Sequence, residues 1–235
     1  MGIIVSEQTT RTERELVPMD LHRAVCTNVI DLGSHKDEKY GKIKRLVRLT
    51  FELADVRDDF EVDGEMKNLP RLMGRQYTMS FNENATLRKH LQSWRKKQFT
   101  PEELAGFDIS KLVGVPCMLN VEHYTGHDGK TYAGIGSITG LPGSMTAPTA
   151  EGEAYYYSID DHGTDFPEAM PDFIKDKVMQ SVEMAGRAPQ APVAAPPPPF
   201  PPVNAPVPQS ASPQGYEPPE QAFEDVDDDL NGIPF

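Results

Sequence analysis

Basic and aromatic residues are interleaved in this sequence, most clearly at two places. Lys36 and Lys39 lie close to Tyr40 in a polar stretch, and Lys130 lies between Tyr124 and Tyr132. Lysine and arginine neutralise phosphates, and aromatic rings stack on unpaired bases at ~1–3 kcal/mol per base. This combination predicts a binding site for single-stranded nucleic acid. The candidate binding residues are Lys36, Lys39, Tyr40, Lys42, Lys44, Arg48, Arg71, Arg75, Tyr124, Lys130 and Tyr132.

Other aromatic and basic residues of the same region fit a structural role better. Tyr77 and Phe81 share strand parity with Met79, so we expect them in the core. Trp94 lies on the apolar stripe of an expected helix and is also interpreted as a core residue. The basic cluster at residues 88–97 is interpreted as the solvated face of that helix.

The sequence lacks the motifs of common catalytic and metal sites. Its six histidines show no HExxH or Cys-His spacing, and it contains neither a GxSxG nor a GxxxxGK[ST] segment. The glycines of residues 132–140 fall in an expected strand rather than a phosphate loop. The acidic run Asp227 to Asp229 lacks the spacing of a calcium loop. We therefore expect a protein that is not an enzyme and that uses no metal or cofactor.

Strand-like patterns are expected to carry most of the candidate binding residues. Residues 22–31 predict a first strand and residues 32–42 a polar loop. Residues 57–72 are acidic and weakly patterned, and we expect a loop there. Residues 75–82 predict a third strand.

Residues 43–56 predict a second strand with two different faces. Residues of alternating parity form an apolar set and a basic set, with Leu46 as an exception. The apolar face is expected to contain Ile43, Val47, Leu49, Phe51 and Leu53. The basic face is expected to contain Lys42, Lys44, Arg48 and Thr50.

The pattern then changes to a helical period. Leu87, Leu91 and Trp94 recur at helical spacing, with Asn82 or Asn84 as the expected N-cap. The segment "TPEE" at residues 100–103 predicts a capping box and a second short helix. Residues 116–124 and 131–141 predict a fourth and a fifth strand, joined by a turn that contains Asp-Gly.

The order β-β-β-α-β-β predicts a mainly β protein with an OB-fold, a five-stranded Greek-key barrel with a helix between strands 3 and 4. Strands 2 and 3 and the 1–2 and 4–5 loops of such barrels bind oligonucleotides or oligosaccharides. Another α+β sheet is the alternative, since strand order cannot be deduced from one sequence. We expect the domain at residues 1–185, with an edge strand in "EAYYYSI" and a packed helix containing Phe173, Ile174 and Val178.

The C-terminal part of the chain has a different composition. Thirteen of the 22 prolines fall between Pro189 and Pro219, which predicts a disordered, extended linker at residues 186–223. Residues 1–150 contain 20 basic and 20 acidic residues, whereas residues 151–235 contain 3 and 16, a balance that equals the net charge of −13. An electrically neutral body with clustered cations can bind phosphate while an acidic tail does something else.

Cysteine use and the N-terminal sequence predict the compartment. Cys26 and Cys117 lie in apolar stretches and are interpreted as buried thiols. The first residues contain no basic start followed by an apolar run, and no stretch approaches the ~18 apolar residues of a membrane span. We therefore expect a cytoplasmic protein that does not enter a membrane.

The chain ends in "DVDDDLNGIPF", behind the proline-rich linker. With the expected barrel, this ending resembles the single-stranded DNA-binding protein family, whose bacterial members end in acids followed by Ile-Pro-Phe. The stretches "VIDLGSHKDEKYG", "SFNENATLRKHLQSW" and "FTPEELAGFDISKLVG" make the body more similar to phage-encoded members. The inserted Leu230-Asn231-Gly232 departs from the family pattern. The residues that match it are Asp227, Asp228, Asp229, Ile233, Pro234 and Phe235.

The resemblance implies a protein that coats and protects single-stranded DNA in replication, recombination or repair, in a bacterial host if phage-encoded. It also implies that the tip, residues 224–235, docks partner enzymes: Phe235 and Ile233 would enter an apolar pocket, and the acids would meet a basic rim. Two alternatives stay open on the residues alone. One is an OB-fold adaptor that binds protein or sugar, and the other is an RNA-binding protein. The oligomeric state stays open too.

Overall fold

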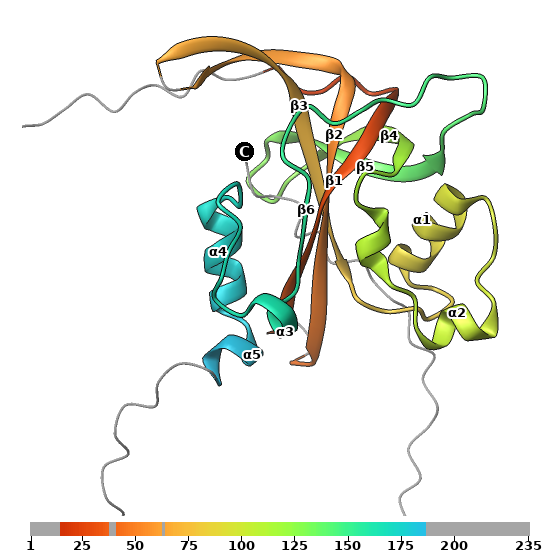
Figure 1. The fold of residues 1–235 in the computed structure, drawn as a ribbon, viewed down its shortest axis with the longest axis vertical. Helices are drawn as coiled ribbons and strands as arrows, with labels where there is room; N and C mark the ends of the chain where they lie inside the picture. The colour runs from red at the N-terminus through yellow and green to blue at the C-terminus, as the bar shows by residue number, and fades with distance from the viewer. Residues whose placement is uncertain (1–14, 38–40, 63, 187–235) are drawn as a thin grey trace, which may run out of the picture.

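The computed structural model describes residues 15–37, 41–62 and 64–186, and its main element is an antiparallel sheet. The sheet has the strand order β3-β2-β1-β4-β5. A short sixth strand, β6 (Tyr155–Tyr157), pairs in parallel with β1. Helices lie on both sides of the strands (Figure 1). The five main strands are β1 (Leu21–Lys36), β2 (Ile43–Val62), β3 (Glu65–Thr78), β4 (Pro116–Thr125) and β5 (Thr131–Gly140).

One hydrophobic core lies between a face of this sheet and helix α1 (Thr86–Arg95). The expected apolar face of β2 and the helical stripe are confirmed, since both sets belong to this core, whereas Thr50 of the expected basic face is buried. Ile43 is the exception: it is 63% exposed, because it begins β2 at the end of the β1–β2 hairpin. Cys26 and Cys117 are buried as expected. The buried hydrophobic residues that β2 and α1 contribute to this core are Val47, Leu49, Phe51, Leu53, Leu87, Leu91 and Trp94.

β1 is longer than the sequence pattern predicts. It continues to Lys36, through residues that we expected in a loop, because β2 pairs with it as far as Lys36 opposite Ile43. The register shifts between Asp31 and Gly33, where Gly33 has φ +77°. A glycine relieves the steric cost of this backbone conformation. The strand therefore bends at the glycine rather than ending there.

Residues 57–72, expected as a loop, form a two-stranded arm instead. β2 and β3 remain paired from Arg57 opposite Pro70 to Val62 opposite Glu65. This arm extends away from the rest of the sheet (Figure 1). The hydrophobic pattern of the arm is weak because its β2 residues alternate between exposed and half-buried positions, and none of those residues is fully buried in a core. Polar contacts join the strands instead: Arg71 Nε lies 3.2 Å from Asp58 Oδ2, and Asn68 donates to Asp59.

The helices begin differently from one another. The N-cap of α1 is Ala85, which has no side chain to cap the helix, so the prediction of Asn82 or Asn84 is wrong. The capping box of α2 (Pro101–Ala105) is confirmed: Thr100 accepts from the Glu103 N–H, and Glu103 accepts from the Thr100 N–H. A 3-10 helix, η1 (Ile109–Leu112), leads into β4.

Trp94 of α1 is buried in the core as expected, and its indole N–H donates to the Pro116 carbonyl at the start of β4.

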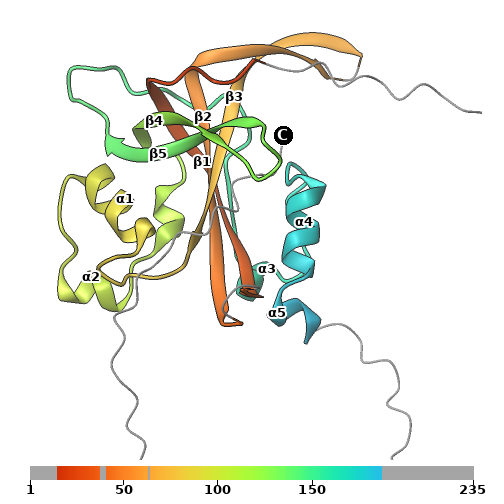
Figure 2. The same cartoon turned by 180° about the vertical axis from the view of Figure 1, so that it is seen from behind.

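A C-terminal extension, residues 150–186, covers the other face of β1 and β2 (Figures 1 and 2). It contains β6, α3 (Ile159–His162), α4 (Asp172–Met179) and α5 (Val182–Ala185). The edge strand and the packed helix expected from the sequence are thereby confirmed. Together the sheet and the extension form a second core. Its buried residues are Ile30, Leu32, Leu46, Tyr157, Ile159, Met170, Ile174, Val178 and Met184.

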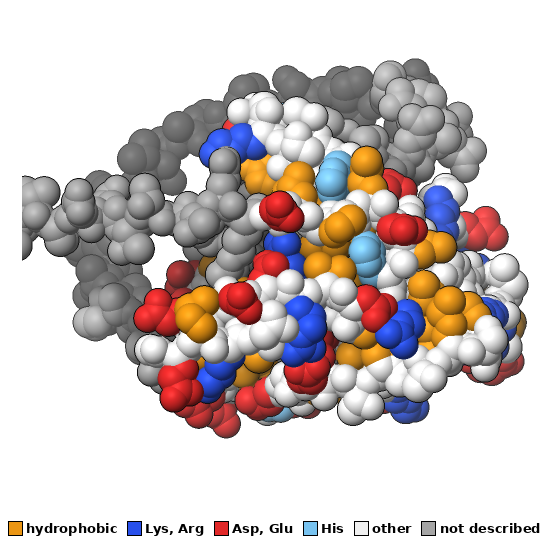
Figure 3. Space-filling model, turned by 90° about the horizontal axis from the view of Figure 1, so that it is seen from above, with side chains coloured by type: hydrophobic (Ala, Val, Ile, Leu, Met, Phe, Trp, Pro, Cys, Tyr) orange, Lys and Arg blue, Asp and Glu red, His pale blue; other side chains and the backbone are white. Residues whose placement is uncertain are grey.

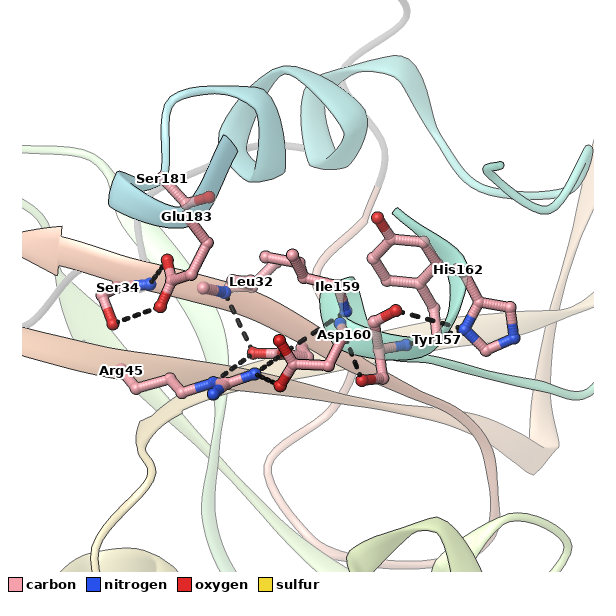
Figure 4. Close-up of polar contacts among 12 residues, drawn as sticks. Leu32, Ser34, Arg45, Tyr157, Ile159, Asp160, His162, Ser181 and Glu183 are labelled. Atoms are coloured by element: carbon pink, nitrogen blue, oxygen red, sulfur yellow. Dashed lines mark hydrogen bonds and ion pairs between the residues drawn. The ribbon is translucent and has the colours of Figure 1, made fainter. Parts of the chain in front are cut away.

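Charged groups fasten the extension to the sheet (Figure 4). The buried carboxylate of Asp31 and the partly exposed Asp160 both pair with Arg45, at 2.6 and 2.7 Å. These acids raise the pKa of Arg45. Glu183 accepts hydrogen bonds from the backbone N–H and the hydroxyl of Ser34. The linker and the tip, residues 187–235, lie outside the described residues.

Candidate nucleic-acid interface

The β4–β5 hairpin brings three of the candidate binding residues together. Tyr124 and Tyr132 lie directly opposite each other in the register. Their rings are stacked, with centroids 5.8 Å apart and planes 29° from parallel. Lys130 is exposed in the turn that joins the strands. A surface ring pair beside a cation has the chemistry to stack on a base and neutralise a phosphate.

The turn of this hairpin is tightly hydrogen-bonded. The Gly126 N–H donates to the Lys130 carbonyl at 2.8 Å, and Gly129 has φ +77°. The Asp128 carboxylate accepts from the Lys130 N–H at 3.1 Å and from the Tyr132 hydroxyl at 2.5 Å. These bonds lower the pKa of Asp128, and the hydrogen bond to Asp128 raises the pKa of Tyr132. Sequence reasoning recognised the Asp-Gly turn but missed this role of Asp128.

Arg75 joins the two ends of the strand order. It lies in β3, and its guanidinium donates to the backbone carbonyl of Ile135 in β5. It also lies over the ring of Tyr77, 5.5 Å from the centroid. Tyr77 is buried and Phe81 packs against the same core, as predicted. Arg75 therefore links β3 to the hairpin strand that carries Tyr132.

Arg48 is placed in an unexpected setting. It lies on the β2 face that the extension covers, with its guanidinium 5.8 Å from the ring centroid of Phe173 in α4. On the sheet side, the guanidinium lies so close to Gly74 of β3 that a Cβ there would collide with it. Burial lowers the pKa of Arg48 to about 10. The expected basic face of β2 is therefore interrupted at this position.

The remaining cations lie near the end of the β1–β2 hairpin and at the base of the arm. Lys36 and Lys42 are exposed near the end of the β1–β2 hairpin, where Lys44 forms an ion pair with Asp37 at 2.9 Å. Lys39 and Tyr40 lie outside the described residues. Arg71, in β3, pairs with Asp58 and donates to the Glu15 carbonyl. Arg71 is thus engaged in the base of the arm.

The face of the described residues that is seen from above carries charges of both signs (Figure 3). Seen from above, positive and negative side chains are interspersed with apolar ones (Figure 3). Within residues 15–37, 41–62 and 64–186, no three His, Cys, Asp or Glu residues are grouped as a metal site would require. No helix in those ranges is long and apolar enough to cross a membrane.

No protein-family model matches this chain, and neither a curated protein nor a solved structure matches it significantly.

Proposed function

We propose that this chain is a single-stranded DNA-binding protein that protects DNA during replication, recombination or repair. The observation that carries the proposal is the β4–β5 hairpin, which presents the stacked rings of Tyr124 and Tyr132 beside Lys130. Rings of this kind stack on any base, so binding without strong sequence preference is expected. The terminal resemblance at residues 227–235 supports the same proposal from a separate part of the chain.

We further propose that the sheet is an OB-type barrel. The strand order β3-β2-β1-β4-β5, with α1 between β3 and β4, is compatible with that fold. The hydrogen bond from Arg75 of β3 to Ile135 of β5 draws the two outer strands towards each other, as partial closure requires. The hairpin with the ring pair then corresponds to the 4–5 loop, which is a binding element of that fold.

The proposed contact surface comprises the hairpin, Arg75 and the lysines near the β1–β2 hairpin end. Lys36 and Lys42 are exposed there, whereas Arg48 lies beneath α4. The extension thus favours a path over the ends of the strands rather than across the middle of β2. Partner enzymes would dock on the tip, with Phe235 as the apolar anchor.

A binding titration at several salt concentrations tests the proposal. The ligand is an unstructured DNA of about 30 nucleotides, longer than the roughly 4–16 nucleotides that one OB-fold covers. RNA of the same sequence and duplex DNA are compared. We expect single-stranded DNA to bind most tightly, with an affinity that falls steeply with salt. Tighter RNA binding would favour the RNA-binding alternative. Absence of nucleic-acid binding would favour an adaptor.

A further inference from the structure

The ring of Tyr132 is held at its hydroxyl end by Asp128. The hydroxyl donates to one carboxylate oxygen at 2.5 Å, and the other oxygen accepts the Lys130 N–H at 3.1 Å. Both oxygens of Asp128 are therefore used inside the hairpin. A carboxylate held at two points within a closed turn can fix the direction of a phenol that donates to it.

The edge of the same ring lies close to the backbone of Gly126, where no side chain stands in its way. A Cβ at this position would lie 2.7 Å from Cε2 of Tyr132 and 2.9 Å from Oδ1 of Asp128. Both distances are shorter than ordinary van der Waals contacts. The absence of a side chain at Gly126 therefore allows the ring and the carboxylate to approach the turn together.

The spacing of the two rings limits how a base can contact them. Their centroids are 5.8 Å apart. A base inserted between the rings would need a separation of roughly 7 Å, because each stacking gap takes ~3.4 Å. The pair is therefore too close to hold a base in its middle, and a base can stack only on a side facing away from the partner ring.

We propose that Asp128 is a positioning residue for nucleic-acid binding, which holds Tyr132 against Tyr124 as a closed two-ring platform for one base at its end. The proposal rests on the proposed function. It differs from a purely structural role because Asp128 acts through the Tyr132 hydroxyl. Phenylalanine at position 132 would keep the ring but lose the restraint.

The test uses the full chain and four variants: Asp128→Ala, Tyr132→Phe, the double variant, and Asp108→Ala as a matched control. Asp108 also accepts a backbone N–H two residues ahead, as the N-cap of the 3-10 helix η1 and outside the β4–β5 hairpin. We expect Asp128→Ala and Tyr132→Phe each to weaken binding of oligo(dT) about three- to tenfold, less than the loss of the whole ring. The double variant should bind no more weakly than either single variant. The control should bind like the wild type.

Losses that multiply in the double variant, or full affinity of Tyr132→Phe, would overturn the proposal. A second measurement separates it from the proposed function. An NMR titration of labelled tyrosine should show the raised pKa of Tyr132 returning towards the ordinary value in Asp128→Ala. If the wild type binds no oligo(dT), the proposed function and the platform role both fail, whereas the titration still decides whether Asp128 holds the ring.

Discussion

At the scale of single residues, basic side chains that share a strand parity in the sequence differ in how much the fold covers them. Arg48 and Lys42 share strand parity, yet Arg48 lies between Phe173 and Gly74, and Lys42 is exposed. Arg48 is half-buried, and removing a cation from water costs free energy, so an apolar side chain of similar length is expected to fit this position without loss of stability. Arg48 is therefore part of the packing between sheet and extension.

We predict that Arg48→Met leaves the melting temperature unchanged or raises it, and changes DNA affinity by less than about twofold. Lys42→Met is the matched comparison. It should weaken DNA binding and reduce the salt slope by about one unit, because one phosphate contact is lost. Thermal unfolding and salt-dependent titrations of both variants provide the measurement. If only Arg48→Met reduced the salt slope of DNA binding, Arg48 would be a phosphate contact and this prediction would be wrong.

The hydrogen bond between Tyr132 and Asp128 has a defined dependence on pH. Because the folded pKa of Tyr132 is raised, its contribution to stability is complete below the ordinary tyrosine pKa and is lost as pH rises through the raised value. The hydrogen bonds from Tyr132 and Lys130 lower the pKa of Asp128, so its carboxylate stays charged at neutral pH and into the acidic range. We predict that DNA binding attributable to Tyr132 is constant between about pH 6 and 9. A difference in affinity between wild type and Tyr132→Phe that changes within this range would contradict the assignment.

At the scale of elements, the contact between α5 and β1 depends on a glycine. Gly33 has φ +77°, and a Cβ there would lie 2.5 Å from Cβ of Ser181 and 2.7 Å from Cδ1 of Ile159. Gly114 has a similar φ of +80°, but nothing lies within 4 Å of its hypothetical Cβ. The two positions therefore share the backbone requirement and differ in packing.

We predict that Gly33→Ala lowers the free energy of unfolding by more than Gly114→Ala does. Both variants incur the backbone strain of about 1–3 kcal/mol. Only Gly33→Ala also displaces the extension, at a further cost of about 1–3 kcal/mol for overpacking. Urea unfolding of both variants measures the difference. If both variants lowered the free energy of unfolding equally, the displacement of the extension by Gly33→Ala would add nothing to the backbone strain, which would contradict the prediction.

The extension as a whole is predicted to be required for folding. Ile159, Ile174 and Val178 are fully or nearly fully buried against the sheet. Burial of each such side chain contributes about 1.5–3 kcal/mol, and a domain is stable by only about 5–15 kcal/mol. A chain that ends at residue 149 should therefore unfold or aggregate, whereas one that ends at residue 186 should melt like the full protein. Circular dichroism melting of the two truncations checks this, and a stable shorter chain would refute it.

At the scale of the whole molecule, the net charge of −13 equals the balance of residues 151–235. The folded extension, residues 151–186, contains 2 basic and 9 acidic residues, and the tail, residues 187–235, contains 1 basic and 7 acidic residues. If the body binds DNA as proposed, we expect the acidic tail to compete with DNA for cations on the body, and we expect salt to weaken this competition by screening. Ile233 and Phe235 contribute no charge, so the docking proposed for the apolar end of the tail can be tested separately from this competition.

We predict that deletion of residues 224–235 modestly tightens DNA binding at low salt, with a difference that shrinks as salt is raised. The deletion should also abolish docking of replication enzymes. Phe235→Ala should abolish docking as well while keeping DNA affinity at the wild-type value, because the apolar anchor is lost and the acids remain. Titrations and pull-downs with replication enzymes measure both effects. Retained docking in Phe235→Ala would show that the tip acts through charge alone.

The sequence by itself determined the features that depend on local chemistry. The alternation of Val47 to Leu53, the stripe that contains Trp94 and the capping box at Thr100 each follow from periodicity or a short motif, and the structure confirms them. The pairing of Tyr124 with Tyr132 across an Asp-Gly turn could also be anticipated, since a short turn sets the register of a hairpin.

Only the tertiary structure decided features that depend on residues distant in the chain. Paired polar strands at residues 57–72 lack the strong pattern that a core imposes, so their arm was mistaken for a loop. The sequence pattern predicts Arg48 as an exposed cation on a strand. In the structure it is covered by α4, which lies more than a hundred residues later in the chain. The orientation of Tyr132 likewise depends on a carboxylate and a glycine that composition alone gives no reason to single out. Periodicity reports whether a side chain faces a core, but not which distant segment completes its surroundings.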